Sequence, residues 1–303
     1  MSTGFSQHEW NPMPDFNCPP LGSHMSIAGG YYKAVDAASK AGCDVVQIFT
    51  KNNNQWKAKP LTEDDHNRFS KALSGHTIKH PISHSSYLIN LASAKDELYQ
   101  KSINSLVLEL ERAEFLGLEG VVLHPGSYVD GAPEDGIQRI IHALKEVLQR
   151  TAELRVRVLL ENTAGQGTAL GWQLEQLKEM ITGISVPDRL GVCIDTCHLF
   201  AAGYPIQTRQ GYEETVSQLE SLIGLDAIKA FHVNDSKREL GSRVDRHEHI
   251  GRGCIGSDAF RWLLQDKRFQ NTPMYLETAK GEEQGEDLDV INLRTLRELA
   301  QSR

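Results

Sequence analysis

The chain has 303 residues and a formal net charge of −8, with 40% hydrophobic and 24% charged residues. These proportions are ordinary for a folded protein and exclude a chain that is disordered throughout. It contains no run of about 18 apolar residues and no apolar stretch at its N-terminus, so we expect neither a membrane span nor a signal peptide. The five cysteines are scattered and odd in number, which favours a reducing, cytoplasmic setting over a disulfide framework.

Residues 1–19 are rich in proline, show no periodicity and are predicted to form a flexible tail, with one domain over residues 20–303. In that domain short β-rich runs alternate with longer amphipathic segments such as 95–117, where apolar residues recur at near-helical spacing. The predicted strands are 21–27, 44–50, 76–84, 120–126, 155–162, 190–198, 227–235 and 273–278.

Eight alternating units in about 280 residues predict an α/β fold of the (β/α)₈ TIM-barrel type, as a single domain. An open, doubly wound sheet has the same alternation and is the rival fold. No GxGxxG motif follows the first predicted strand, which removes the main dinucleotide-binding argument for that rival. We therefore expect the closed barrel.

Metal-ligand residue types gather at the carboxyl ends of the predicted strands, where TIM barrels build their active sites. They are His84, His124, Glu161, Asp195, His198, His232 and Glu277, followed by Asp245 and His247 in the loop after the seventh strand. A single such histidine is usually a hydrogen-bonded structural residue. So many buried imidazoles and carboxylates at one end would be costly without partners, and shared cations solve that problem.

Imidazole and carboxylate ligands suit Zn²⁺, with Mn²⁺ or Fe²⁺ as alternatives. Nine candidate ligands exceed what one catalytic zinc takes, so we expect two or three ions that share a carboxylate. Several cations would also offset the negative net charge, which otherwise disfavours nucleic acid as a partner. Cys193 and Cys197 lie in phase with Asp195, and we interpret them as small buried apolar residues.

Five motifs resemble, in order, those of the endonuclease IV family of apurinic/apyrimidinic (AP) endonucleases. They are HSSYLINLAS (84–93), LHPGS (123–127), LENTAGQG (160–167), GVCIDTCHLFAAGY (191–204) and HVNDSKRELGSRVDRHEHIG (232–251). The resemblance covers essentially everything except the tails. It implies a TIM barrel that holds three Zn²⁺ ions, with Mn²⁺ possible at one site.

The resemblance also implies how the ligands are shared among the ions. His84, His124 and Glu161 would hold the first ion. Glu161 would bridge to a second ion, also held by Asp195, His232 and Glu277, and would position the nucleophile. His198, Asp245 and His247 would hold the third ion.

The implied reaction is hydrolysis of the DNA backbone on the 5′ side of an abasic site, which leaves a 3′-hydroxyl and a 5′-deoxyribose phosphate. Blocked 3′ ends would be trimmed as well. The implied partner is double-stranded DNA that carries either lesion, and we expect a monomer. An abasic nucleotide is the easiest to extrude because it forgoes little stacking.

Several residues are predicted to contact DNA. By resemblance Tyr87 and Leu88 would penetrate the duplex as wedges. Asn54 stands where better-known members of the family place an intercalating arginine, and Arg252 stands where an acidic residue is commoner. Further candidates for phosphate contacts are Lys51, Lys57, Lys237, Arg243 and Arg246.

Two other functions are compatible with parts of this pattern. A sugar isomerase or epimerase would explain the barrel and some ligands, but not the group at 245–247 or the Tyr87 loop. A protein that binds lesions without cutting them would lack at least one ligand, and none is missing. We therefore expect the hydrolase.

Overall fold

The computed structural model describes residues 18–184, 186 and 188–302. Residues 1–17 of the predicted tail lie outside this part of the chain. Cys18 packs against the core and Pro19 is buried, so the domain includes both residues.

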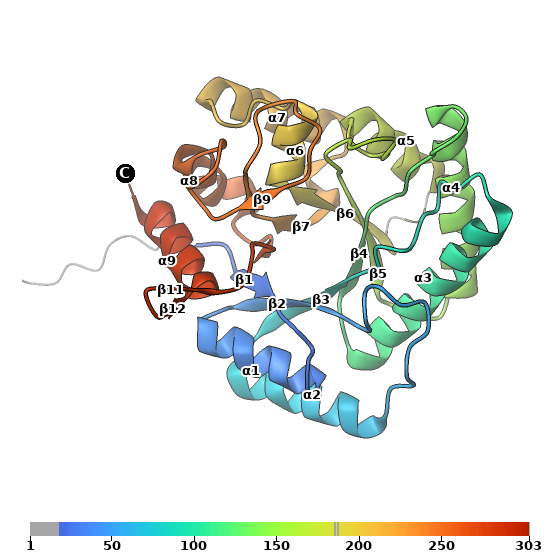
Figure 1. The fold of residues 1–303 in the computed structure, drawn as a ribbon, viewed down its shortest axis with the longest axis horizontal. Coiled ribbons are helices and arrows are strands. Elements are labelled where there is room, and N and C mark those ends of the chain that lie inside the picture. The colour runs from blue at the N-terminus through green and yellow to red at the C-terminus, as the bar shows by residue number, and fades with distance from the viewer. Residues whose placement is uncertain (1–17, 185, 187, 303) are drawn as a thin grey trace, which may run out of the picture.

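Eight parallel strands form a closed barrel, as predicted (Figure 1). Around the barrel each strand pairs with its neighbours in the order β1-β10-β7-β6-β5-β4-β3-β2. The strands are β1 (Leu21–His24), β2 (Val45–Phe49), β3 (Lys79–His84), β4 (Gly120–Leu123), β5 (Arg157–Glu161), β6 (Leu190–Asp195), β7 (Ile228–His232) and β10 (Met274–Leu276). Each lies within one of the eight predicted runs.

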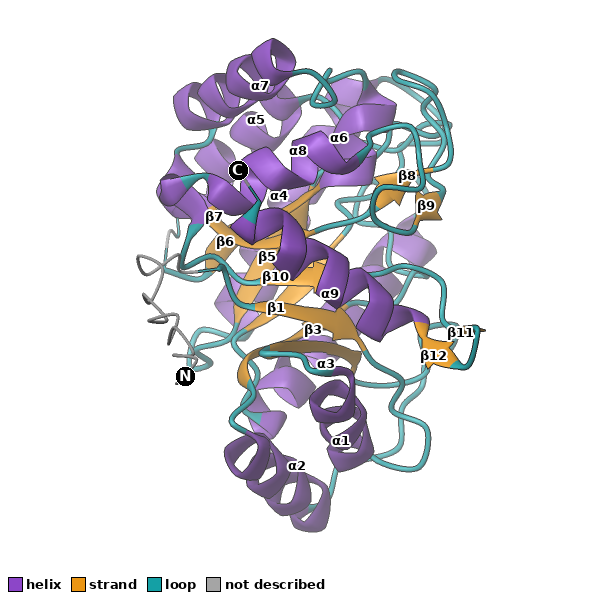
Figure 2. Cartoon of the chain, turned by 90° about the vertical axis from the view of Figure 1, so that its left-hand side faces the viewer, coloured by secondary structure: helices purple, strands orange, loops and turns teal. Residues whose placement is uncertain are grey.

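Helices surround the barrel and connect its strands (Figures 1 and 2). They are α1 (Tyr31–Ala41), α2 (Glu63–His76), α3 (Asp96–Leu116), α4 (Pro133–Arg150), α5 (Leu174–Ile184), α6 (Thr196–Ala202), α7 (Arg209–Leu222), α8 (Ser257–Gln265) and α9 (Leu288–Gln301). Two short 3₁₀ helices, η1 (Leu225–Ala227) and η2 (Lys267–Phe269), precede β7 and β10. None of the described helices is long and apolar enough to cross a membrane.

Local sequence accounts for the helix ends. α3 matches the segment predicted at 95–117, and Gly117 ends it in the left-handed conformation at φ 76°. α2 begins with a capping box in which the Thr62 hydroxyl accepts from the Asp65 amide and the Asp65 carboxylate accepts from the Thr62 amide.

The sixth predicted strand, 190–198, is wrong at its end. β6 stops at Asp195, whose side chain accepts a hydrogen bond from the His198 amide at 2.8 Å and so caps α6. His198 therefore lies in the first turn of a helix. The third predicted strand, 76–84, begins too early, because His76 is the last residue of α2 and β3 begins only at Lys79.

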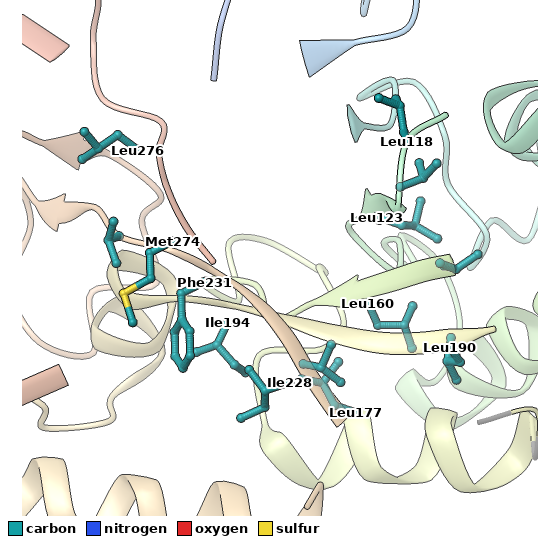
Figure 3. Close-up of a cluster of buried hydrophobic side chains, with 14 of the residues drawn as sticks. Leu118, Leu123, Leu160, Leu177, Leu190, Ile194, Ile228, Phe231, Met274 and Leu276 are labelled. Carbon is teal, nitrogen blue, oxygen red and sulfur yellow. The ribbon is translucent and has the colours of Figure 1, made fainter. Parts of the chain in front are cut away.

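Strand alternation divides the apolar side chains between two layers. Outward-facing residues such as Leu123, Leu160, Ile194 and Phe231 belong to the large core between barrel and helices, part of which is drawn in Figure 3. The interior of the barrel is filled by a second cluster, composed of Val45, Ile82, Val122, Leu159, Cys193, Ala230 and Tyr275.

Two short hairpins extend the carboxyl end of the barrel. β8 (Asp235–Ser236) pairs with β9 (His247–Glu248) just after β7, and β11 (Glu282–Glu283) pairs with β12 (Glu286–Asp287) after β10. Both hairpins lie at the same end of the molecule in Figure 2.

Candidate metal centre

Polar side chains form a layer inside the barrel, directly above its apolar interior. Because side chains two positions apart on a strand point to the same side, the residue two after each interior residue also points inward, one layer nearer the carboxyl end. Those residues are Gln47, His84, His124, Glu161, Asp195, His232 and Glu277, which follow Val45, Ile82, Val122, Leu159, Cys193, Ala230 and Tyr275 in turn.

β1 completes this layer with His24, two residues after Gly22. A Cβ at Gly22 would lie 1.9 Å from the Val45 carbonyl oxygen, so only glycine fits there. His24 and Gln47 were missed by the sequence analysis. The two-residue offset from an interior position would have identified both.

Glu161 lies at the centre of the layer and is fully buried. Its Oε2 atom is 3.2 Å from His84 Nε2 and 3.0 Å from His124 Nε2, whereas its Oε1 atom is 2.8 Å from His232 Nδ1. The ligand atoms of His84, His124 and Glu161 lie within 4.8 Å of one another. Glu161 thus offers one oxygen to each of two neighbouring groups.

The second group adds Asp195, His232 and Glu277 to Glu161, again with all ligand atoms within 4.8 Å. His232 Nδ1 is 3.2 Å from Glu277 Oε2 and 3.9 Å from Asp195 Oδ2. Glu161, Asp195 and His232 are completely buried. Three carboxylates lie so near one another in this buried site that positive charge is required between them.

A third group lies at the edge of the barrel and is composed of His198, Asp245 and His247. Asp245 stands between the two rings, with Oδ2 at 3.1 Å from His198 Nε2 and Oδ1 at 3.3 Å from His247 Nε2. His198 comes from α6, Asp245 lies just before β9, and His247 is the first residue of β9. The structure therefore gathers all nine candidate ligands into three adjoining groups.

Hydrogen bonds fix which ring nitrogen each histidine turns toward the carboxylates. Nδ1 of His84, His198 and His247 donates to the carbonyl oxygens of Ser85, Asn162 and Glu277 at 2.8, 2.9 and 3.3 Å. In the neutral ring the other nitrogen, Nε2, is then a bare acceptor.

His232 is oriented the opposite way. Its Nε2 atom donates to Gln47 Oε1 at 2.8 Å, so Nδ1 is the bare nitrogen that faces Glu161 and Glu277. In the described residues the buried Nε2 atoms of His198 and His247 have no hydrogen-bond partner. Bare nitrogens that face carboxylate oxygens at about 3 Å are pairs of acceptors, and a cation between them resolves the conflict. The donor set therefore fits divalent metal ions.

The electrostatics of the buried groups show the same demand for positive charge. Burial alone would lower the pKa of His232, but neighbouring acidic groups, among them Glu277 and Glu161, raise it well above its ordinary value. Burial alone would likewise raise the pKa of Glu161, but the surrounding histidines keep it well below its usual range. A divalent cation would meet the same demand, and protons would compete with it for these nitrogens.

Amide side chains hold Asp195 in place. Asn234, which is buried, donates to Asp195 Oδ2 at 2.7 Å and accepts from the Glu277 amide at 2.8 Å. Asn162 accepts from the Asp195 amide at 2.7 Å. The Asn234 amide thus links the Asp195 carboxylate to the backbone of Glu277, another member of the second group.

Cys193 and Cys197 are both fully buried, as expected. Burial raises the pKa of each thiol to about 12, which keeps both protonated. Cys193 belongs to the apolar interior of the barrel. The Cys197 sulfur also lies within 4.8 Å of ligand atoms of Asp195 and His247.

The predicted DNA-contacting residues lie at the same end of the barrel, with different surroundings. Tyr87 is 59% exposed and stands above the first group, with its ring centroid 5.4 Å from that of His84. Leu88 is half-buried and Asn54 is exposed. Lys57, Lys237, Arg243 and Arg246 are exposed as well.

Several predicted phosphate-binding side chains have partners in the protein, such as Glu248 for Lys237 at 3.9 Å. Arg252 forms a two-pronged ion pair with Glu283 of β11, at 3.1 and 2.6 Å, so its charge is already compensated. Lys51 is buried and its ammonium group lies 3.2 Å from Glu109 Oε1. The prediction for Lys51 is therefore wrong in this structure, because a buried lysine requires an internal acidic partner.

A pocket of about 370 Å³ opens beside the first and third groups. His124, His198 and Asp245 form its metal-ligand side, and Tyr87 forms part of its rim. Its other polar lining is neutral and includes Asn90, Ser127, Thr163 and Gln166. A substrate in this pocket would have its reacting atoms beside the candidate ligands.

Fold and site together define a member of the xylose isomerase-like TIM barrels, and the model of that family matches residues 35–298. A probable endonuclease 4 from Citrifermentans bemidjiense is 47% identical over 281 residues, which cover 93% of this chain and 99% of the relative. Endonuclease IV from Thermus thermophilus aligns with a TM-score of 0.81 and 37% identity, over 93% of this chain and 98% of that structure. The chain belongs to the endonuclease IV family, which confirms the resemblance.

Sugar-converting enzymes share the fold at much lower identity. A D-tagatose 3-epimerase-like protein aligns with a TM-score of 0.70 over 92% of this chain and 96% of that structure, at 18% identity. That likeness shows the barrel alone. The identity to endonuclease IV separates the predicted hydrolase from its isomerase rival.

Proposed function

We propose that this protein is an AP endonuclease that hydrolyses the DNA backbone 5′ to an abasic site and leaves a 3′-hydroxyl and a 5′-deoxyribose phosphate. We further propose that it trims blocked 3′ ends, acts as a monomer and holds three Zn²⁺ ions, one of which Mn²⁺ can replace. The observation that carries the proposal is the convergence of nine candidate ligands in three adjoining groups, two of which line one pocket.

Each group has a defined set of ligands in this proposal. His84, His124 and Glu161 would hold one ion, and Glu161 would share the second with Asp195, His232 and Glu277. His198, Asp245 and His247 would hold the third. When bound, these cations would supply Lewis-acid chemistry, which makes a nucleophile available from water at neutral pH and offsets charge on phosphoryl oxygens.

The protein's own side chains provide the geometry for that chemistry. Glu161 fixes the spacing of the first two groups, because its two oxygens face different histidines. Asp195 performs a similar task toward the third group, since its Oδ2 atom is 3.6 Å from His247 Nε2. The neutral polar lining of the pocket can donate hydrogen bonds to a deoxyribose and its phosphates without adding charge.

Tyr87 and Leu88 would act as wedges in the duplex, where an exposed aromatic ring above the metal groups is suited to replace lost stacking. Asn54, Arg246 and Arg252 would contact the DNA around the lesion. The ion pair between Arg252 and Glu283 would first have to break, so that Arg252 could bind a DNA phosphate in place of the carboxylate.

Incision of a labelled duplex that carries one tetrahydrofuran abasic analogue tests the proposal. We expect a single cut 5′ to the analogue, a product that a polymerase can extend, and about three zinc ions per chain by elemental analysis. Prolonged chelation should remove zinc and incision together. An undamaged duplex of the same sequence is the control.

Two outcomes would contradict the proposal. Full incision by the demetallated protein would exclude the metal centre as the reactive site. Interconversion of a ketose such as D-tagatose, without any cleavage of abasic DNA, would favour the isomerase instead.

A further inference from the structure

A buried network of charged and polar side chains connects two loops at the carboxyl end of the barrel. The first loop, residues 50–62, follows β2 and contains Asn54. The second loop, residues 85–95, follows β3 and contains Tyr87 and Leu88. No role in the metal groups accounts for this network.

Glu109 is the centre of the network. It lies on α3, and its side chain is 1% exposed. Its Oε1 atom is 3.2 Å from the Lys51 ammonium group and accepts from the Ser86 amide at 3.3 Å, and its Oε2 atom accepts from the Thr50 hydroxyl. One carboxylate therefore holds the first residues of the 50–62 loop and the start of the 85–95 loop.

Further hydrogen bonds connect the loops to each other. The Ser86 hydroxyl donates to the Asn53 carbonyl at 2.5 Å and accepts from the Leu88 amide at 3.3 Å. The Lys51 ammonium group donates to the Gln55 carbonyl at 2.8 Å. Hydrogen bonds thus hold the backbone on both sides of Asn54. One of their donors, the Ser86 hydroxyl, also holds the backbone of Leu88.

Apolar packing anchors the first loop near its end, where Leu61 packs against the core, but not around Asn54. Among residues 51–60, Lys51 is the buried one, and all the others are exposed or half-buried. Arg112, one turn after Glu109 on α3, adds hydrogen bonds to the Thr50 and Lys59 carbonyls at 2.6 and 2.7 Å. The part of the loop around Asn54 therefore depends on polar contacts for its shape, several of them with α3.

We propose that Glu109 is a positioning residue for lesion recognition, which sets the relative placement of the 50–62 and 85–95 loops through its buried pair with Lys51. The inference rests on the proposed function, because the loops matter only if they contact DNA. A buried ion pair contributes little net stability compared with apolar packing, but it restricts the geometry, since separating the two charges in the interior is costly. Preordered loops bind without the entropic cost of ordering them on the DNA.

Glu109→Gln tests the proposal, since it keeps the size of the side chain but leaves the Lys51 charge without its counter-ion. We expect KM for a short abasic duplex to rise by about tenfold or more, the equivalent of about 1.4 kcal/mol of binding, with kcat unchanged within about twofold. A general loss of structure would lower kcat as well, rather than raise KM alone. The matched control is Glu111→Gln, an exposed glutamate two residues away on α3, which should change neither constant.

A second measurement reports the loop itself and needs no DNA. Lys57 is exposed within the 50–62 loop, so trypsin should cut after it faster in Glu109→Gln than in the unmodified protein or in Glu111→Gln. Combining Lys51→Gln with Glu109→Gln removes both charges, so KM should be lower in the double variant than in Glu109→Gln alone. A double-mutant cycle measures this difference. If Glu109→Gln does not fold, Ser86→Ala removes the contact between the loops without altering a charge and should raise both KM and cleavage after Lys57.

The outcomes separate this inference from the proposed function. Unchanged KM together with unchanged cleavage after Lys57 would overturn the role of Glu109, as would a fall in kcat alone. An unmodified protein that fails to cut abasic DNA would overturn the proposed function, and the cleavage rates at Lys57 would still decide whether Glu109 orders the loop.

Discussion

Gln47→Leu is the most direct test of how the metal groups are oriented. Gln47 is fully buried and uses its whole amide: it accepts from His232 Nε2 at 2.8 Å and donates to Glu277 Oε1 at 2.5 Å and to His24 Nδ1 at 2.9 Å. Leucine has a similar volume but offers none of these bonds. His232 would lose the acceptor that keeps its proton on Nε2, and with it the fixed direction of Nδ1.

The magnitude follows from the number of contacts that are lost. Removal of a partner behind a metal ligand weakens metal binding by about 10- to 100-fold, which corresponds to about 1.4–2.8 kcal/mol. His232 and Glu277 both belong to the second group, so the ion shared with Glu161 should be the one affected. The first and third groups do not contain either residue and should retain their ions.

Zinc titration against a competing chelator, with elemental analysis after dialysis, measures this loss. We expect Gln47→Leu to retain about two ions where the unmodified protein retains about three. Its incision activity should fall in proportion to the loss of the ion from the second group. Ser83→Ala is the matched control, because Ser83 is a buried polar residue of the adjacent strand β3 whose hydroxyl has no hydrogen-bond partner in the described part of the chain. It should bind zinc normally.

Normal zinc affinity and normal incision in Gln47→Leu would refute the reasoning, because the direction of His232 Nδ1 would then not depend on the amide. A variant that loses all its ions would also contradict it, since only the second group contacts Gln47.

Three further substitutions test other parts of the site. Glu161→Gln should reduce incision by at least about 10²–10³-fold, since it removes the shared charge, and full activity would sink the assignment. Asn54→Arg should tighten binding to abasic DNA by up to about tenfold, and an unchanged Kd in a filter-binding assay would show that the 50–62 loop stays outside the duplex. Glu283→Gln should free Arg252, raise DNA affinity at low salt and steepen the slope of log K against log salt by about 0.9, whereas Glu286→Gln in the same hairpin should not.

The number and order of the barrel strands were predictable because their signals are local, although several predicted runs extend past the strand ends, as 120–126 does past Leu123. The alternation of short apolar runs with amphipathic segments predicts eight βα units, and the position of Glu161 at the end of its run already indicates the active end of the barrel. The pattern fails where a side chain alters the local backbone. Asp195 caps a helix, which removes His198 from the strand although its residue type and its place near the site were correct.

Residue types alone determined that this chain holds a cluster of imidazoles and carboxylates, and the motifs determined its family. Only the closed barrel decided which atoms meet. Gln47 and His232 are 185 residues apart in sequence, and their contact depends on the tertiary arrangement of β2 and β7 across the barrel. The burial of Lys51 was equally invisible, because a lysine in a polar loop looks like a surface charge until the helix that carries Glu109 packs beneath it. Local patterns fix where a side chain points along its own strand, whereas the neighbours that give it a charge state and a role come from distant parts of the chain.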